Sequence, residues 1–145
     1  MSASLPQVGA QLPPCTPDDL AKVMKLRRLI DERTIPCEFP TEAFFHAGCY
    51  VRTCKVPRDT LLAGAVIKVP TVLVVCGHCY VTTGSNVQEI DGFAVLRGAP
   101  GRSQVFRALE DTYLTMVYAS KAESLDAAEE EFTDEFEELL TRKHP

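Results

Sequence analysis

The sequence predicts a mainly β fold, an antiparallel sandwich or barrel with one α-helix before it and one after it. From Phe44 to Tyr118, apolar and polar residues alternate with a period of two, and turn-forming residues interrupt the pattern at short intervals. Many short strands without intervening helices are typical of sandwiches and barrels. Residues 16–32 and 124–142 instead repeat apolar residues at helical spacing, so we expect a helix on each side of the strands.

The composition is that of an ordinary globular domain. The 145 residues suit one domain with its own core, since 46% of them are hydrophobic and 24% are charged. A net charge of −5 disfavours direct nucleic-acid binding, which needs a basic surface. No apolar run approaches the roughly 20 residues that span a bilayer, and Met1 to Cys15 lacks the pattern of a secretory leader. We therefore expect no membrane partner, a cytoplasmic setting and six reduced cysteines, most of them buried.

The first segment, Met1 to Pro14, is rich in proline, serine and glycine and is expected to form an extended arm. A helix should begin after an N-cap at Thr16, because Asp18 and Asp19 suit its positive end, and it should continue to about Glu32. Its apolar residues are Leu20, Val23, Met24, Leu26 and Ile30, and its basic residues are Lys22, Lys25, Arg27 and Arg28. Such a helix is either a solvated surface element or a contact for an acidic partner.

The strands follow one another with little chain between them. A strand over Cys49 to Val56 should end at the turn sequence Pro57-Arg58-Asp59. Further strands are expected near residues 60–68, 71–82, 87–90, 93–97, 103–108 and 112–118. The turn sequences among them are Gly84-Ser85-Asn86, Asp91-Gly92, Gly98-Ala99-Pro100-Gly101 and Glu110-Asp111.

The last segment predicts a helix from Ser124, a suitable N-cap, to Arg142. Its apolar residues are Leu125, Ala128, Phe132, Phe136, Leu139 and Leu140. Its acidic residues are Glu129, Glu130, Glu131, Asp134, Glu135, Glu137 and Glu138, a set expected to form a solvated face. The two phenylalanines must be covered either by the barrel or by another subunit.

Three segments together resemble the cupin superfamily: FFHAGCYVRTCKVPRDTLLAGAVIK, VLVVCG and PGRSQVFRALEDTYLTMVY. More narrowly, they resemble small phage-encoded cupin-like proteins. The resemblance covers Phe44 to Ser120 and implies a jelly-roll barrel that is often assembled into dimers or larger oligomers. The chain then divides into an arm and basic helix (1–40), the barrel (41–120) and an acidic helix (121–145).

The resemblance also shows where a cupin metal would be bound. Metal-binding cupins supply two histidines and a glutamate before the glycine that matches Gly77, and a further histidine three residues after the glycine that matches Gly101. In this sequence the first positions are Val66 to Pro70 and the second is Gln104. A catalytic metal needs about three good donors, so we expect no metal and no cofactor.

The sequence Cys76-Gly77-His78-Cys79 is the one motif with metal or redox potential. It continues an apolar run that reads as a strand, so alternation places Cys76 and His78 on one face and Cys79 on the other. A redox Cys-x-x-Cys instead requires a helix N-terminus. Buried structural cysteines are therefore the favoured interpretation, although a bulge at Gly77 would change which way the side chains face.

Catalytic residues are not evident. The three histidines are His46, His78 and His144, and no serine or cysteine has an arguable base, so we expect a protein that is not an enzyme. Alternation places Gln104, Phe106 and Ala108 inside the barrel, with Val105 and Arg107 facing the other way. The candidate interior polar residues are Gln104, His78 and Tyr118.

Two functions follow from these expectations. The first is a non-enzymatic structural or assembly protein, a virion component made in the host cytoplasm, which forms homo-oligomers and contacts other assembly proteins. Its candidate interface residues are Leu20, Val23, Arg27, Ile30, Phe132 and Phe136. The oppositely charged helices would steer contacts between subunits or pair within one subunit. The alternative is a cytoplasmic barrel that binds a small ligand, or an enzyme that works without metal.

Overall fold

A computed structural model describes residues 7–33, 39–83 and 86–139 of the chain. Its elements in chain order are β1 (Val8–Leu12), α1 (Pro17–Arg33), β2 (Thr41–His46), β3 (Cys49–Val56), β4 (Leu61–Ala63), β5 (Thr71–Thr83), β6 (Asn86–Gly98), β7 (Val105–Ala108), β8 (Thr112–Ala119), α2 (Leu125–Phe132) and the 3-10 helix η1 (Phe136–Glu138). Neither helix is long and apolar enough, within these residues, to cross a membrane.

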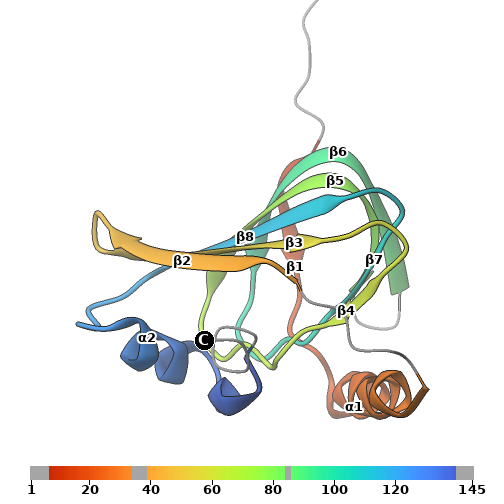
Figure 1. The fold of residues 1–145 in the computed structure, drawn as a ribbon, viewed down its shortest axis with the longest axis horizontal. Coiled ribbons are helices and arrows are strands. Elements are labelled where there is room, and N and C mark those ends of the chain that lie inside the picture. The colour runs from red at the N-terminus through yellow and green to blue at the C-terminus, as the bar shows by residue number, and fades with distance from the viewer. Residues whose placement is uncertain (1–6, 34–38, 84–85, 140–145) are drawn as a thin grey trace, which may run out of the picture.

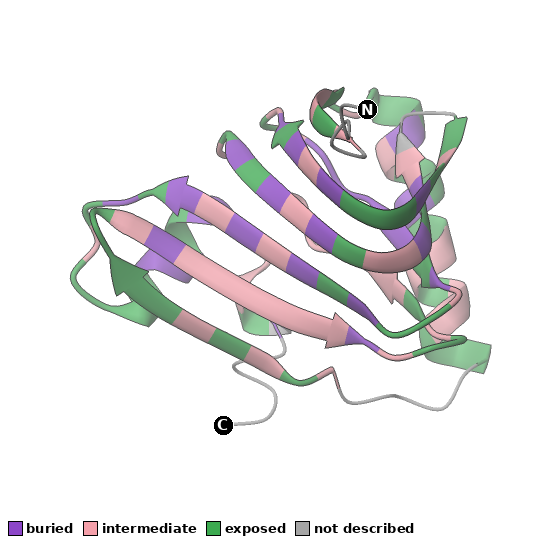
Figure 2. Ribbon diagram, turned by 90° about the horizontal axis from the view of Figure 1, so that it is seen from above, coloured by how far each residue is buried: buried purple, intermediate pink, exposed green. Residues whose placement is uncertain are grey.

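The strands form one curved sheet in the order β1-β6-β5-β8-β3-β2, and β7 and β4 extend it from the other part of β5. All pairings are antiparallel except that of β1 with β6. The sheet curves around an apolar interior, and both helices lie on the same side of it (Figure 1). The outer face of β2, β3, β8 and β5 carries no helix and is the face seen in Figure 2. This arrangement agrees with the predicted barrel and its flanking helices.

The β2–β3 hairpin shows how local sequence determines register. Ala47 and Gly48 both have positive φ, 53° and 72°, and His46 pairs with Cys49 on either side of them. Two such residues form the type I′ turn whose twist matches that of paired strands. The strand predicted over Cys49 to Val56 is confirmed.

Strands β5 and β6 form one long ribbon, and the turn predicted at Asp91-Gly92 is wrong. Gly92 instead lies within β6 opposite Gly77 of β5, and both glycines have positive φ (102° and 143°). A Cβ at Gly77 would lie 2.6 Å from the hydroxyl oxygen of Thr112, so glycine lets the start of β8 approach closely. Burial still alternates across Gly77 without a change of phase.

The described part of the N-terminal arm, from residue 7 onward, packs on its own barrel. Strand β1 pairs with β6, and Leu12 is buried in the core. Helix α1 then begins with the predicted cap, because Thr16 Oγ1 accepts from Asp19 N while Asp19 Oδ2 accepts from Thr16 N, both at 3.1 Å. Only Asp19 and Val23 of this helix are buried, so most of its surface is solvated.

The C-terminal helix is shorter than the helix predicted from Ser124 to Arg142. Ser124 does cap α2, but the helix ends at Phe132, because the buried Thr133 takes an extended conformation. The chain after Phe132 then runs beside residues 66–68, and the Phe132 carbonyl accepts from Lys68 N. The last part of the predicted helix, residues 140–142, lies outside the described residues.

Candidate functional site

The inner face of the segment that leads into β7 carries the interior polar groups. Residues 102–106 and Ala108 are all buried, whereas Arg107 is exposed. Gln104 is buried, as are its two neighbours in sequence, so burial here does not distinguish the two faces. Val105, expected on the opposite face, is buried as well.

Among the described residues Arg102 is the largest fully buried side chain, with 2% of its surface exposed. Its Nη2 donates to Thr71 Oγ1, while Nε and Nη1 have no hydrogen-bond partner among the described residues. Burial lowers the pKa of this guanidinium to about 10, and the nearby Cys15 thiol opposes that shift, so Arg102 stays charged at neutral pH. The guanidinium fits because residue 98 is glycine: a Cβ there would lie 2.4 Å from Nη2.

Gln104 adds a second donor to the same interior face. The backbone carbonyl of Gln104 accepts from Gly64 N at 3.0 Å, which holds the backbone in place. The side-chain Nε2 is buried and has no hydrogen-bond partner among the described residues. A guanidinium and an amide do not fit a divalent metal, which needs several carboxylate, imidazole or thiolate donors. No group of three or more such donors occurs within residues 7–33, 39–83 and 86–139.

Tyr118, the second predicted interior residue, belongs to an aromatic cluster that seats α2. Its hydroxyl donates to the Ala128 carbonyl, and burial raises its pKa. The Tyr118 ring lies 5.3 Å from that of Tyr50 and 5.9 Å from that of Phe132, measured between centroids. Its polar end is therefore engaged by the helix.

A buried ion pair lies beside this cluster. Arg52 Nη1 is 3.1 Å from Glu129 Oε2, and the Glu129 side chain is only 4% exposed. The Arg52 guanidinium also lies 6.0 Å from the centroid of the Phe132 ring. Glu129 was expected on a solvated acidic face; that expectation is wrong, because α2 turns this carboxylate towards the cation on β3.

His78, the third predicted interior residue, lies on the outer face of β5. Its Nε2 is 3.4 Å from Glu89 Oε1 without hydrogen-bond geometry. Cys76 shares this face and is exposed, whereas Cys79 is buried, so the predicted facing of the motif is confirmed. The structure does not bring His78 to Gln104 and Tyr118.

The described cysteines are free thiols, but the expectation that most are buried is wrong. Only Cys79 is buried; Cys15, Cys49 and Cys54 are half-buried and Cys76 is exposed. The sixth, Cys37, lies outside the described residues.

Most of the residues predicted at an interface pack against other residues of the same chain. Val23 is buried, and Leu20, Ile30 and Phe136 are half-buried. Phe132 is 1% exposed within its own barrel, which leaves no surface of that side chain for a partner. Arg27 Nη1 lies 2.7 Å from Glu135 Oε2, so the oppositely charged terminal segments pair within one subunit.

The outer face of the sheet carries an apolar row that sequence inspection did not find. Phe44 of β2 pairs with Val51 of β3, Val51 with Val117 of β8, and Val117 with Val72 of β5. These four residues, the outer row, cross four strands at one level. Phe44 and Val72 are 54% and 44% exposed, and the two valines between them are half-buried. Finding the row requires the register between strands, which no single segment contains.

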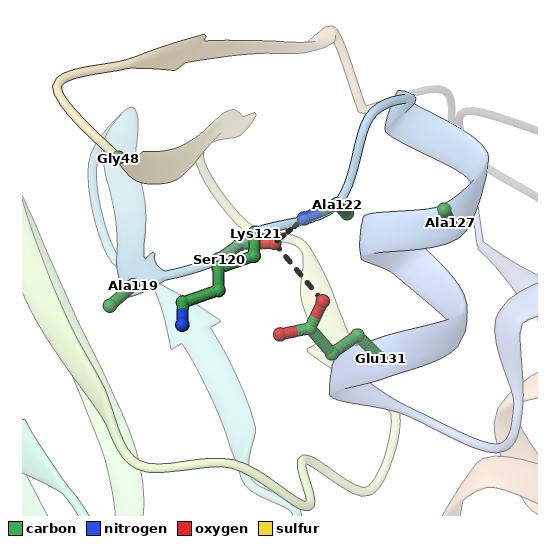
Figure 3. A pocket seen from close by; sticks show the side chains of 7 residues that line it. All are labelled: Gly48, Ala119, Ser120, Lys121, Ala122, Ala127 and Glu131. Carbon is green, nitrogen blue, oxygen red and sulfur yellow. Dashed lines mark hydrogen bonds between the residues drawn. The ribbon is translucent and has the colours of Figure 1, made fainter.

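A shallow depression lies between the β2–β3 turn and α2 (Figure 3). Its lining residues are Gly48, Ala119, Ser120, Lys121, Ala122, Ala127 and Glu131. Ser120 Oγ donates to Glu131 Oε2 at 3.0 Å and accepts from Ala122 N at 3.1 Å. The serine and the carboxylate thus bind one another, and small side chains make up most of the remainder, so the depression does not assemble a reactive site.

No family model and no curated protein sequence matches the chain. Solved structures do. The chain is similar to a cupin 2 conserved barrel domain protein from Salinispora arenicola, with 10% identity, a TM-score of 0.50, and coverage of 57% of this chain and 76% of that one. A cupin superfamily protein from Desulfitobacterium hafniense matches with 10% identity, a TM-score of 0.50, and coverage of 62% and 93%.

A third similar structure is salicylate 1,2-dioxygenase from Pseudoaminobacter salicylatoxidans, with 11% identity, a TM-score of 0.48, and coverage of 70% of this chain but only 31% of that one. Identities this low concern the fold alone. The two cupin structures above, each with a TM-score of 0.50, confirm the predicted cupin-type jelly-roll barrel.

Proposed function

We propose that the protein is a non-enzymatic assembly unit that binds a second copy of itself through the outer face of its sheet. The virion of a phage is the setting that the sequence resemblance implies. The outer row carries this proposal, because it places four apolar side chains at one level of a face that the helices leave uncovered (Figures 1 and 2).

The outer row is a contiguous apolar surface and not a set of isolated apolar residues. Neighbouring strands lie about 4.8 Å apart, so a row across four strands extends about 14 Å. Val74 and Val95 pair at the next level and add to it. Contiguous exposed apolar surface in a soluble protein usually marks an interaction site.

Charges on the two sides of the outer row favour a second copy as the occupant. Arg97 of β6 pairs with Val72 on one side of the outer row, and Glu42 lies beside Phe44 on β2, the edge strand on the other side. A two-fold axis along β8 would place β6 of one copy over β2 of the other. Arg97 would then approach Glu42 and Phe44 of the second copy, and the same contact would repeat on the other side of the axis.

Sedimentation equilibrium of the purified chain tests this proposal. We expect a dimer or a larger oligomer, and Phe44→Lys with Val72→Lys should weaken association at least about a hundredfold, because charges would be buried in an apolar contact. Both positions are exposed, so the fold should tolerate the lysines.

Val87→Lys is the matched control, since Val87 is exposed at the far end of β6. A wild-type chain that stays monomeric at high concentration would contradict the proposal. So would equal association constants for all three proteins. The particle setting is tested separately by mass spectrometry of purified virions, where absence of the chain would exclude a virion role and leave self-association untouched.

A further inference from the structure

The segment Arg102 to Gln104, whose first residues lie beside residues 12–15, holds buried hydrogen-bond donors that have no acceptor among the described residues. Three buried nitrogen atoms are involved: Nε and Nη1 of Arg102 and Nε2 of Gln104. Residues 12–15 pack against residues 99–101, since Cys15 N donates to the Gly101 carbonyl and Ala99 N donates to the Leu12 carbonyl. The outer row lies on the opposite face of the sheet, so this region is independent of self-association.

An unpaired buried guanidinium is costly. Removing an ion from water costs several kcal/mol unless an opposite charge and hydrogen bonds compensate, and native buried polar groups almost always have partners. Thr71 Oγ1 accepts from Nη2 but carries no charge. The pKa of Arg102 is lowered by burial and raised by the Cys15 thiol, and no carboxylate contributes to its shift. Within residues 7–33, 39–83 and 86–139, the chain thus supplies a cation and donors here and no paired anion.

The positions of the two side chains suggest the shape of the missing acceptor. Arg102 and Gln104 lie two residues apart in the segment that leads into β7, and both are buried. An acceptor with two oxygens joined to one atom can receive hydrogen bonds from both side chains at once. A spherical ion meets this arrangement less well, and a cation is repelled by it.

We infer that this region binds a small carboxylate, with Arg102 supplying the charge and Gln104 Nε2 supplying a second donor. The site selects for small size because Arg102 is 2% exposed and Gln104 is 6% exposed. Bound here, the carboxylate neutralises the guanidinium and satisfies the amide.

Isothermal titration with sodium acetate at constant ionic strength tests the site. Wild-type protein should bind one acetate per chain, and chloride should compete weakly. Gln104→Met keeps the length of the side chain and removes the amide donor, so acetate affinity should fall at least about tenfold. Arg102→Met should abolish binding. Arg107→Met is the control, because Arg107 is exposed on the other face of β7 and its loss should leave affinity unchanged.

A crystal structure at high resolution with acetate gives the direct readout, namely acetate within hydrogen-bond distance of Arg102 and Gln104. An ordered water alone at this place would overturn the inference, as would equal acetate affinity in wild type and Gln104→Met. Because wild type and Gln104→Met decide the outcome between them, the result does not depend on whether Arg102→Met folds.

Discussion

At the scale of single residues, burial decides the chemistry of the Cys76–Cys79 motif. The two thiols lie three residues apart on opposite faces of β5, where Cys76 is exposed and Cys79 is enclosed by the core. Burial raises the pKa of Cys79 to about 11, because the interior disfavours the thiolate. Alternation predicted the two faces, but only the packed barrel shows which face is covered.

The raised pKa of Cys79 predicts a loss of stability in alkali. Its folded pKa of about 11 exceeds the ordinary value of 9.0, so the folded state holds the proton more tightly than the unfolded state. The contribution of this thiol is therefore complete below about pH 9 and disappears as the pH rises towards 11. Urea unfolding should show the difference in free energy between wild type and Cys79→Ala shrinking over this window.

Val75→Ala is the control for this measurement. Val75 is also fully buried in β5 and carries no titratable group, so its cost should be independent of pH. If the difference in free energy of unfolding between wild type and Cys79→Ala is equally constant from pH 8 to 11, the pKa of the Cys79 thiol is not raised in the folded state.

Arg102 shows how near the sequence pattern came to the candidate site. Alternation placed Gln104, Phe106 and Ala108 inside the barrel, and one further step along the segment reaches Arg102. A charged residue after a turn sequence reads as exposed, since arginine is seldom buried. Glycine at position 98 removes the steric obstacle, and that contact joins residues that only the fold brings together.

At the scale of elements, the β2–β3 hairpin has a turn that its sequence fits only in part. Gly48 suits a positive φ, whereas Ala47 takes a φ of 53°, which is unfavourable for a residue with a Cβ. Asparagine tolerates this conformation better, and Asn-Gly is the preferred pair in type I′ turns.

Ala47→Asn should therefore raise the free energy of unfolding by about 0.5–1 kcal/mol, measured by urea denaturation. Gly48→Ala should lower it by about 1 kcal/mol, because its φ of 72° would then belong to a residue with a Cβ, although a Cβ there meets no neighbour within 4 Å. Equal stabilities for wild type and Ala47→Asn would show that the turn relaxes without cost.

At the scale of the whole molecule, the C-terminal segment closes the barrel. Phe132, Ala128 and Leu139 enter the core, the Phe132 carbonyl accepts from Lys68 N, and Glu135 Oε1 accepts from Val66 N at 2.8 Å. The Arg27–Glu135 and Arg52–Glu129 pairs join the segment to α1 and to β3. Of the two covers expected for Phe132, the barrel or another subunit, the structure has the barrel of the same chain.

Phe132→Ala should accordingly lower the free energy of unfolding by about 3–5 kcal/mol, because it leaves a cavity between Tyr50 and Tyr118. Circular dichroism during thermal unfolding measures this loss. Leu125→Ala, at an exposed position of the same helix, should cost under about 1 kcal/mol. Similar costs for both variants would show that α2 only rests on the surface.

The sequence by itself determined the class of fold, most strand positions, the start of both helices and the facing of the Cys76–Cys79 motif, because these depend on local periodicity and capping. Tertiary structure decided which surfaces the terminal segments cover. It also decided that Asp91 and Gly92 lie within β6 and not in a turn, and which buried polar groups have no partner. It also decided the outer row, since Phe44 and Val72 are neighbours only through the register of four strands. The physical reason is the same in each case: periodicity is a property of one segment, whereas burial and pairing depend on every segment that packs against it.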